Sequence, residues 1–287
     1  MSICETLSFG RTPSSPCRVV AILGASGGIG RALVESYRGE DVSLYLVARN
    51  GRSRLAEFAE AATSNGDYSF LRVFHADLSA PTNASALADA MLDALARDFE
   101  PANRRFDELI FAAGVDLMAP DLRTLEFDAR LALAWQVDVA STIHVARRIG
   151  NFMRDERRAR SANSRDGGIL FFSWDGVARG RTGETSAIYA TCKGAIAAYA
   201  RALAQELAPE VRVNTIAPGW IQTRWGASAP ESIRARLRVD SLAQRWGEPR
   251  EIASLARFLL SENASYVNGQ TVEANGGYAY SGSNSQD

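Results

Sequence analysis

The chain has 287 residues, of which 23% are charged, and its formal net charge is −1 at pH 7. This balance excludes a general electrostatic attraction to nucleic acid or to an acidic membrane surface, and no apolar run approaches the ~18 residues of a membrane span. The three cysteines and two histidines show neither metal-ligand spacing nor a disulfide pattern, so we expect no metal and a reducing, cytoplasmic location.

Short apolar segments with the character of strands alternate with longer segments of helical periodicity. The predicted strands are residues 18–23, 42–48, 70–74, 108–113, 168–173, 211–216 and 270–274. The predicted helices are residues 29–38, 52–62, 84–98, 126–153, 186–208 and 249–261. This alternation indicates parallel βαβ units with right-handed crossovers. We therefore predict an α/β fold, a single-domain Rossmann-like doubly wound parallel sheet of about seven strands with helices on both faces.

The ends of the chain and one internal segment depart from this alternation. We predict flexible tails at residues 1–17 and 281–287, which leaves one domain over residues 18–280. Residues 219–247 mix glycine, proline, tryptophan and charge without a single periodicity. A long irregular segment in an α/β domain is often functional, so we expect a substrate loop or lid there.

Directly after the first predicted strand lies the glycine-rich turn "GASGGIG". Glycines allow the backbone to approach a pyrophosphate closely, and the N-terminus of the following helix favours an anion. The alternative is a tight turn that binds nothing, but the strand before it and the helix after it favour a dinucleotide. The predicted contacts are Gly24, Ser26, Gly28, Ile29 and Gly30, with Ser26 in place of the second glycine of the usual spacing.

The second predicted strand ends without the carboxylate that would bind the ribose 2′-hydroxyl of NAD. Arg49 follows that strand, and a guanidinium can pair with a 2′-phosphate through charge-assisted hydrogen bonds. A solvated arginine at the end of a strand is the alternative. We therefore predict NADP(H) as the cofactor in preference to NAD(H).

Tyr189 and Lys193 lie four residues apart in a predicted helix, within "SAIYATCKG". Residues at this spacing share one face of a helix. A phenol with a pKa of about 10 is a poor base near neutral pH, but a nearby ammonium stabilises its phenolate. We therefore expect Lys193 to move the pKa of Tyr189 toward the working range. Two unrelated surface side chains are the alternative.

Several motifs occur together and in order: "LGASGGIG", "HADLS", "FAAG", "YATCK", "VNTIAPGWIQT" and the segment that begins "RWGEPREI". Through these motifs the chain resembles the short-chain dehydrogenase/reductase family over about residues 18–280. The resemblance implies hydride transfer between a nicotinamide cofactor and a carbonyl or secondary-alcohol carbon. It also implies that Tyr189 is the general acid/base, and that Lys193 supports it and binds the nicotinamide ribose.

A serine that binds the substrate oxygen is the family's third catalytic residue. Its counterpart is Ser173 in "FFSWDG", 16 positions before Tyr189. This separation is longer than is typical of the family, so we infer a small insertion in "GVARGRTGETS". A serine that merely ends a strand is the alternative, and Ser186 is the nearest rival hydroxyl.

Two positions depart from the family's pattern. "FAAG" replaces the family's "NNAG", although the backbone of Ala112, Ala113 and Gly114 can still face the cofactor. Asp138 stands where the family usually carries an asparagine of a water-linked proton relay. Its carboxylate would tend to keep Lys193 protonated. We expect this change to affect the rate and pH dependence more than the type of reaction.

The resemblance also implies further contacts. The remaining cofactor contacts would be Asp77, Leu78, Pro218, Gly219, Ile221 and Thr223. Trp174, Trp220 and Trp225 would form an apolar wall of the substrate site. Packing is the alternative for each tryptophan. A role in a loop or in the core is the alternative for each cofactor residue, although it explains the whole set poorly.

These observations predict an NADP(H)-dependent oxidoreductase, and we favour a ketone reductase acting on a small molecule. The alternative is a non-catalytic NADP(H)-binding regulator or scaffold on the same fold, which the departures at Ala112 and Asp138 suggest. Family members commonly assemble through two long helices. We therefore expect a homodimer or homotetramer that uses residues 126–153 and 186–208.

Overall fold

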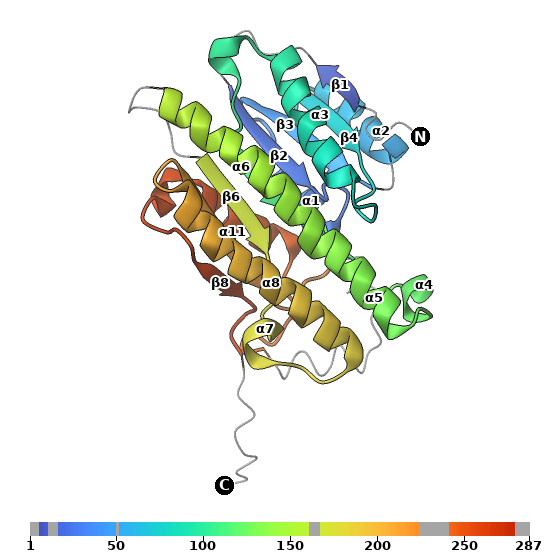
Figure 1. Ribbon diagram of the computed structural model, residues 1–287. Helices are drawn as coiled ribbons and strands as arrows, with labels where there is room; N and C mark the ends of the chain where they lie inside the picture. The colour runs from blue at the N-terminus through green and yellow to red at the C-terminus, as the bar shows by residue number, and fades with distance from the viewer. Residues whose placement is uncertain (1–5, 11–16, 50–51, 161–166, 224–240, 279–287) are drawn as a thin grey trace.

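An eight-stranded sheet forms the centre of the structure (Figure 1). This computed structural model describes residues 6–10, 17–49, 52–160, 167–223 and 241–278. The strands are β1 (Thr6–Gly10), β2 (Arg18–Leu23), β3 (Val42–Ala48), β4 (Phe70–His75), β5 (Glu108–Phe111), β6 (Gly167–Phe172), β7 (Val211–Pro218) and β8 (Thr271–Ala274). Their order across the sheet is β1-β4-β3-β2-β5-β6-β7-β8, and only the β1–β4 pair is antiparallel among the described strands. The predicted doubly wound α/β fold is confirmed.

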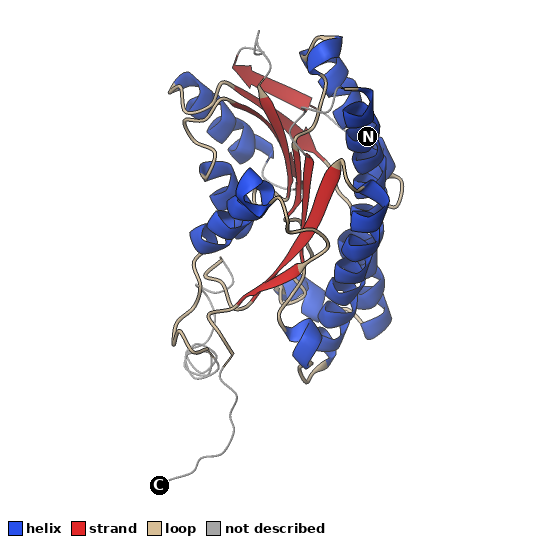
Figure 2. Ribbon diagram, turned by 90° about the vertical axis from the view of Figure 1, so that its left-hand side faces the viewer, coloured by secondary structure: helices blue, strands red, loops and turns tan. Residues whose placement is uncertain are grey.

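Helices cover both faces of this sheet (Figure 2). The helices are α1 (Gly28–Glu35), α2 (Arg52–Ser64), α3 (Asn83–Asp98), α4 (Pro120–Arg123), α5 (Phe127–Ala134), α6 (Ser141–Ala159), α7 (Gly176–Arg179), α8 (Glu184–Leu207) and α11 (Pro249–Leu260), with the short turns η1 (Pro101–Asn103), η2 (Trp135–Ala140) and η3 (Glu262–Ala264). One hydrophobic core lies against α3, α6 and α8, and the other against α1, α2 and α11. Every residue of β3 and β6 is buried, as expected for parallel strands covered on both faces.

The prediction of a flexible N-terminal tail is wrong for Thr6–Gly10. These residues form β1, which pairs antiparallel with β4 in a register that places Thr6 opposite Phe74. Phe9 packs against the core on the α1, α2 and α11 side, and this burial together with the backbone ladder holds the strand at the edge of the sheet. Residues 1–5, 11–16 and 281–287 of the predicted tails lie outside the described residues.

The long helix predicted at residues 126–153 is built from three parts. Helix α5 continues into η2, which is a π-helical turn, and η2 continues into α6. A π-helical turn adds a residue to the helical path and is frequently found at functional sites. It contains Asp138 here, so the irregular part of this helix coincides with a predicted site residue.

The predicted substrate loop at residues 219–247 is described only at its two ends. Residues 224–240 lie outside the described part. At the ends, Ile221 forms an isolated bridge with Gly247, and Ser241 forms one with Tyr278. Among the described helices, none combines the length and hydrophobicity that crossing a membrane requires.

Candidate active site

The predicted site residues meet at the carboxyl edge of the parallel strands. Gly24 follows β2, Ala112 follows β5, Ser173 follows β6, and Pro218 ends β7. Parallel strands bring these ends to one edge of the sheet, where open α/β folds bind their ligands. Helix α8 packs beside β6 and β7 and carries Tyr189.

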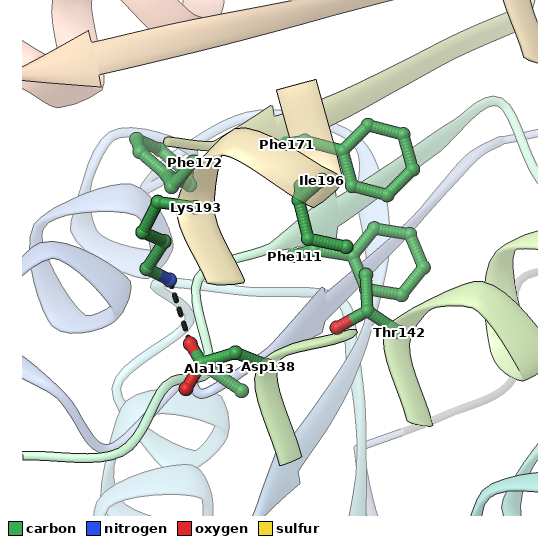
Figure 3. Close-up of a pocket in the computed structure, with 8 residues that line it drawn as sticks. All are labelled: Phe111, Ala113, Asp138, Thr142, Phe171, Phe172, Lys193 and Ile196. Atoms are coloured by element: carbon green, nitrogen blue, oxygen red, sulfur yellow. Dashed lines mark hydrogen bonds and ion pairs between the residues drawn. The ribbon is translucent and has the colours of Figure 1, made fainter. Parts of the chain in front are cut away.

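A buried ion pair joins Lys193 to Asp138 in this region (Figure 3). Lys193 Nζ donates to Asp138 Oδ1 over 2.7 Å, and the two side chains are 7% and 1% exposed. Asp138 Oδ2 accepts a second hydrogen bond, 3.1 Å long, from the Val115 backbone N–H. A side chain at Gly114 would collide with this pair, because its Cβ would lie 2.9 Å from Asp138 Oδ1. The pair is therefore held from several sides.

Tyr189 lies beside this ion pair without being part of it. Lys193 Nζ lies 5.4 Å from the centroid of the Tyr189 ring. The indole of Trp174 packs edge-on against the same ring, with 5.4 Å between centroids. The ring is half-buried, and its hydroxyl makes no hydrogen bond within the described part of the chain. The phenol proton is therefore free for a ligand.

The net direction of the Tyr189 pKa differs from the prediction. Burial raises the pKa of Tyr189, the Lys193 ammonium lowers it, and the carboxylates of Asp138 and Asp116 raise it again. The resulting pKa lies above that of an ordinary phenol. The expected effect of Lys193 is present, but burial and the carboxylates outweigh it.

The ion pair keeps Lys193 charged, as predicted from the carboxylate at residue 138. Burial alone would lower the pKa of Lys193, but Asp138 and Tyr189 more than offset this and raise the pKa above its ordinary value. The ammonium is the form that can stabilise a phenolate at Tyr189.

Ser173 is buried beside the same helix. Its hydroxyl donates a 2.9 Å hydrogen bond to the backbone carbonyl of Lys193. Trp174, the next residue along, contacts Tyr189. The structure therefore brings Ser173, Tyr189 and Lys193 together, although they come from a strand end and a helix. Ser186 lies in the first turn of α8.

The glycine turn is packed too tightly for side chains. Gly24 has φ +87°, and a Cβ there would lie 2.5 Å from the Ala113 backbone nitrogen. A Cβ at Gly30 would lie 2.1 Å from the Gly24 carbonyl oxygen, and one at Gly28 would lie 2.8 Å from Thr223 Cγ2. The turn, the residues after β5 and Thr223 therefore converge, as a cradle for a dinucleotide requires.

The other predicted cofactor residues occupy varied positions. Arg49 is exposed directly after β3. Asp77 is exposed, and its Oδ1 accepts the Ser79 backbone N–H, whereas Leu78 is buried. The Gly219 backbone N–H donates to Ala274. Ser26, Ile29 and Gly114 are exposed or half-buried near the turn, and Ile221 is buried.

Two of the three predicted wall tryptophans lie around one arginine. The guanidinium carbon of Arg181 lies 6.0 Å from the Trp174 ring centroid and 5.5 Å from that of Trp220. Trp246 extends this group, 5.8 Å from Trp220. Trp225 lies outside the described residues. Arg181 belongs to the inferred insertion, whose sequence has no recognisable site motif.

The sequence also gave no signal for Asp175. This residue is buried after Ser173 and Trp174, and its Oδ1 has no hydrogen-bond partner within the described chain. Burial raises the pKa of Asp175, although Arg181 and Asn275 lower it. The described residues contain no group of three or more His, Cys, Asp or Glu side chains that could hold a metal ion.

Comparison with known proteins identifies the family. The family model described as enoyl-(acyl carrier protein) reductase matches residues 24–279. The short-chain reductase protein NovJ of Streptomyces niveus is 32% identical over 270 residues, which cover 90% of this chain and 93% of that protein. The chain belongs to the short-chain dehydrogenase/reductase family. It is therefore an NAD(P)-dependent oxidoreductase.

Solved structures of this family share the fold. The 3-oxoacyl (acyl-carrier-protein) reductase of Agrobacterium tumefaciens C58 with NADP bound has 25% identity and a TM-score of 0.74, covering 91% of this chain and 94% of that one. The 3-oxoacyl-[acyl-carrier protein] reductase of Brucella melitensis with bound NAD has 26% identity and a TM-score of 0.70, covering 93% and 92%. Membership of the short-chain dehydrogenase/reductase family therefore does not select between the two nucleotides.

Proposed function

We propose that the protein is an NADP(H)-dependent reductase that converts a ketone to a secondary alcohol, with Tyr189 as its general acid/base. The arrangement of Tyr189 beside the buried Lys193–Asp138 pair carries this proposal. A positioned phenol with a free proton and a neighbouring ammonium has the chemistry of a proton donor. Ser173 and the glycine turn lie at the same edge of the sheet.

When bound, the nicotinamide supplies or accepts the hydride. Tyr189 donates its phenol proton to the substrate oxygen, so the Tyr189 O–H bond breaks as the alcohol O–H bond forms. The Ser173 hydroxyl, which donates to the Lys193 carbonyl, can rotate its single proton toward the substrate oxygen. Lys193 stabilises the phenolate that remains. In the reverse direction, the Tyr189 phenolate accepts the alcohol proton.

Arg49 supports the choice of NADP(H). Its side chain is exposed at the carboxyl end of β3, where a guanidinium can pair with a 2′-phosphate. Isothermal titration with NADPH and NADH tests this choice. We expect Arg49→Ala to weaken NADPH binding about tenfold or more, which corresponds to about 1.4 kcal/mol, and to leave NADH binding unchanged. Equal losses for both nucleotides would contradict the role of Arg49.

The reaction is tested with purified protein, NADPH and a panel of ketones, following absorbance at the wavelength of the reduced nicotinamide. We expect consumption of NADPH with at least one ketone and its loss in Tyr189→Phe. Tyr199→Phe is a matched control, because Tyr199 lies on the same helix and its hydroxyl contacts only the Ile143 carbonyl, at 3.5 Å, among described residues. Full activity in Tyr189→Phe would refute the assignment.

The tryptophans around Arg181 indicate the kind of substrate. Trp174 and Trp220 around Arg181 suit a substrate with apolar or planar parts.

We infer a homodimer or homotetramer that uses α5, α6 and α8, because Leu125, Phe127 and Trp135 are 40%, 42% and 46% exposed next to these helices. Light scattering measures this state. A cytoplasmic location stays a prediction from the sequence.

A further inference from the structure

Asp138 has surroundings that strengthen its electrostatic effect. Its side chain is almost fully buried, and its two oxygens are held by Lys193 Nζ at 2.7 Å and by the Val115 N–H at 3.1 Å. The small cavity beside the pair is lined mainly by apolar side chains, among them Phe111, Phe171 and Ile196 (Figure 3). Charges in such surroundings are screened weakly. The negative charge of Asp138 therefore acts on Lys193 more strongly than it would at an exposed site.

The π-helical turn places this carboxylate. Within η2, Val137, Asp138 and Val139 are all buried, whereas a regular amphipathic helix at a surface buries residues three and four apart. The turn packs against α8, which carries Lys193. The geometry therefore turns Asp138 toward the helix that bears the reacting pair.

Four charged or titratable groups act electrostatically on the Tyr189 phenol. Lys193 and Cys192 lie on α8, Asp138 lies on η2, and Asp116 lies in the loop after β5. From the loop after β6, Trp174 packs against the ring and is uncharged. Lys193 alone would favour a phenolate at Tyr189. Asp138 cancels much of that charge at close range, and Asp116, which is exposed, adds a weaker negative field.

We propose that Asp138 is a positioning residue that holds Tyr189 in its protonated phenol form by neutralising Lys193. Asp138 thereby extends carbonyl reduction to higher pH and confines alcohol oxidation to alkaline pH. The inference rests on the proposed function, because it takes Tyr189 as the acid in reduction and its phenolate as the base in oxidation. It concerns the pH range of each direction and leaves the overall equilibrium unchanged.

The proton balance follows directly. In reduction the Tyr189 O–H bond breaks, the substrate oxygen gains that proton, and the carbonyl carbon gains the hydride. The phenolate left beside a nearly neutral Lys193–Asp138 pair is a strong base, so it regains a proton from solvent, which reaches the half-buried ring. Oxidation requires the phenolate first, and it therefore depends on loss of the Tyr189 proton to solvent.

The first test is a pH titration of wild type and Asp138→Asn. The asparagine keeps the size of the side chain and an oxygen for the Val115 N–H but carries no charge. We expect the pH midpoints of kcat/KM for ketone reduction and for alcohol oxidation to fall by about one unit or more in Asp138→Asn. The matched control is Asp116→Asn, which removes an exposed carboxylate that also raises the pKa of Tyr189, and it should move both midpoints less.

The second test does not depend on turnover. Tyrosinate absorbance is followed against pH, and the difference between wild type and Tyr189→Phe isolates the titration of Tyr189. In the purified full chain without added nucleotide, we expect a midpoint above the ordinary phenol value of about 10, and a lower midpoint in Asp138→Asn. This measurement on the wild type holds even where Asp138→Asn does not fold.

The outcomes separate the two proposals. Activity retained in Tyr189→Phe overturns the proposed function. If Tyr189→Phe is inactive but Asp138→Asn shows the wild-type midpoints in rate and absorbance, the function stands and the role of Asp138 is overturned. A wild-type absorbance midpoint below about 10 also overturns the role of Asp138.

Discussion

Among the clusters of the described chain in which a tyrosine, a cation and a carboxylate come together, the cluster around Tyr45 and the cluster around Tyr189 use these groups differently. At the first, Tyr45 of β3 donates to Asp98 at the end of α3, and Arg72 of β4 donates to both oxygens of the same carboxylate. Tyr45 is 0% exposed. The Tyr45 hydroxyl proton is therefore held in a buried hydrogen bond to Asp98.

At the second cluster the cation makes the bond to the carboxylate. Lys193 is paired with Asp138, and the hydroxyl of Tyr189 is bonded to neither within the described chain. Tyr189 is also half-buried. The phenol of Tyr45 is hydrogen-bonded and buried, so that cluster is a structural contact. The phenol of Tyr189 makes no such bond at the edge of the sheet, so that cluster is a candidate proton donor.

Removing each hydroxyl tests whether Tyr189 and Tyr45 have different functions. We expect Tyr189→Phe to lower kcat of ketone reduction by about 10³-fold, as the loss of a general acid does, with little change in the free energy of unfolding. We expect Tyr45→Phe to retain activity but to lose about 1.5–3 kcal/mol of stability, because its partner is charged. Steady-state kinetics and urea unfolding measure both. Equal activities in the two variants would remove the distinction.

Removing each cation tests what the carboxylates require. Lys193→Met and Arg72→Met each leave a buried carboxylate without its ion pair, which costs about 3–5 kcal/mol. Only Lys193→Met should also abolish reduction. A buried unpaired carboxylate gains a proton in acid, so the loss of stability in each variant should be smaller near pH 5 than near pH 7. Adding Asp138→Asn to Lys193→Met should restore part of the lost stability. Urea unfolding at the two pH values decides this. A loss that does not depend on pH would contradict the ion-pair explanation.

Alkaline pH separates the two tyrosines by their protons. Burial and the hydrogen bond to Asp98 raise the pKa of Tyr45, and burial raises that of Tyr189, although Lys193 offsets part of the latter. Above pH ~10 the unfolded chain loses phenol protons that the folded chain keeps, so stability falls by up to about 1.4 kcal/mol per pH unit for each tyrosine. This stability is complete below pH ~10 and decreases as the pH rises toward the folded pKa.

We expect the free energy of unfolding to fall less steeply with pH in Tyr45→Phe than in the wild type. Tyr189→Phe should show the same change to a smaller extent. Urea unfolding between about pH 9 and about pH 11 measures the slope. Tyr199→Phe gives a third, half-buried tyrosine for comparison, and it should also flatten the slope, because burial raises the pKa of Tyr199 to about 12. An unchanged slope in Tyr45→Phe would show that its proton is not retained in the folded state.

Much of the fold could be predicted because buried strands appear in the sequence as continuous apolar runs. The bounds of β2 and β3 agree with the predicted residues 18–23 and 42–48, since strands covered on both faces are continuously apolar. The edge strand β1 has no such pattern. Its partner Phe74 is distant in sequence from Thr6, and a short edge strand with one face in solvent resembles a tail.

The site was predictable where it depends on local spacing. Tyr189 and Lys193 are one turn apart on α8, and Ser173 directly follows β6, so their positions follow from the sequence, while their roles stay predictions. The contact of Lys193 with Asp138 depends on a π-helical turn, and the raised pKa of Tyr189 depends on tertiary burial. Neither has a local signal. The same is true of Arg181, which lies in an insertion.

A single methyl group added at Gly114 tests how closely the Lys193–Asp138 pair must be packed. Its Cβ would lie 2.9 Å from Asp138 Oδ1 and 3.3 Å from Lys193 Nζ, so Gly114→Ala should displace the ion pair and lower kcat of reduction about tenfold through misplacement of the reacting groups. Gly194→Ala is the control, because a Cβ there would lie 3.4 Å from Val177 Cγ1, an ordinary contact. It should keep its activity and gain up to about 1 kcal/mol from helix propensity. If both variants keep wild-type kcat, the close packing around the ion pair is not needed for the reaction, and Lys193 acts on Tyr189 through charge alone.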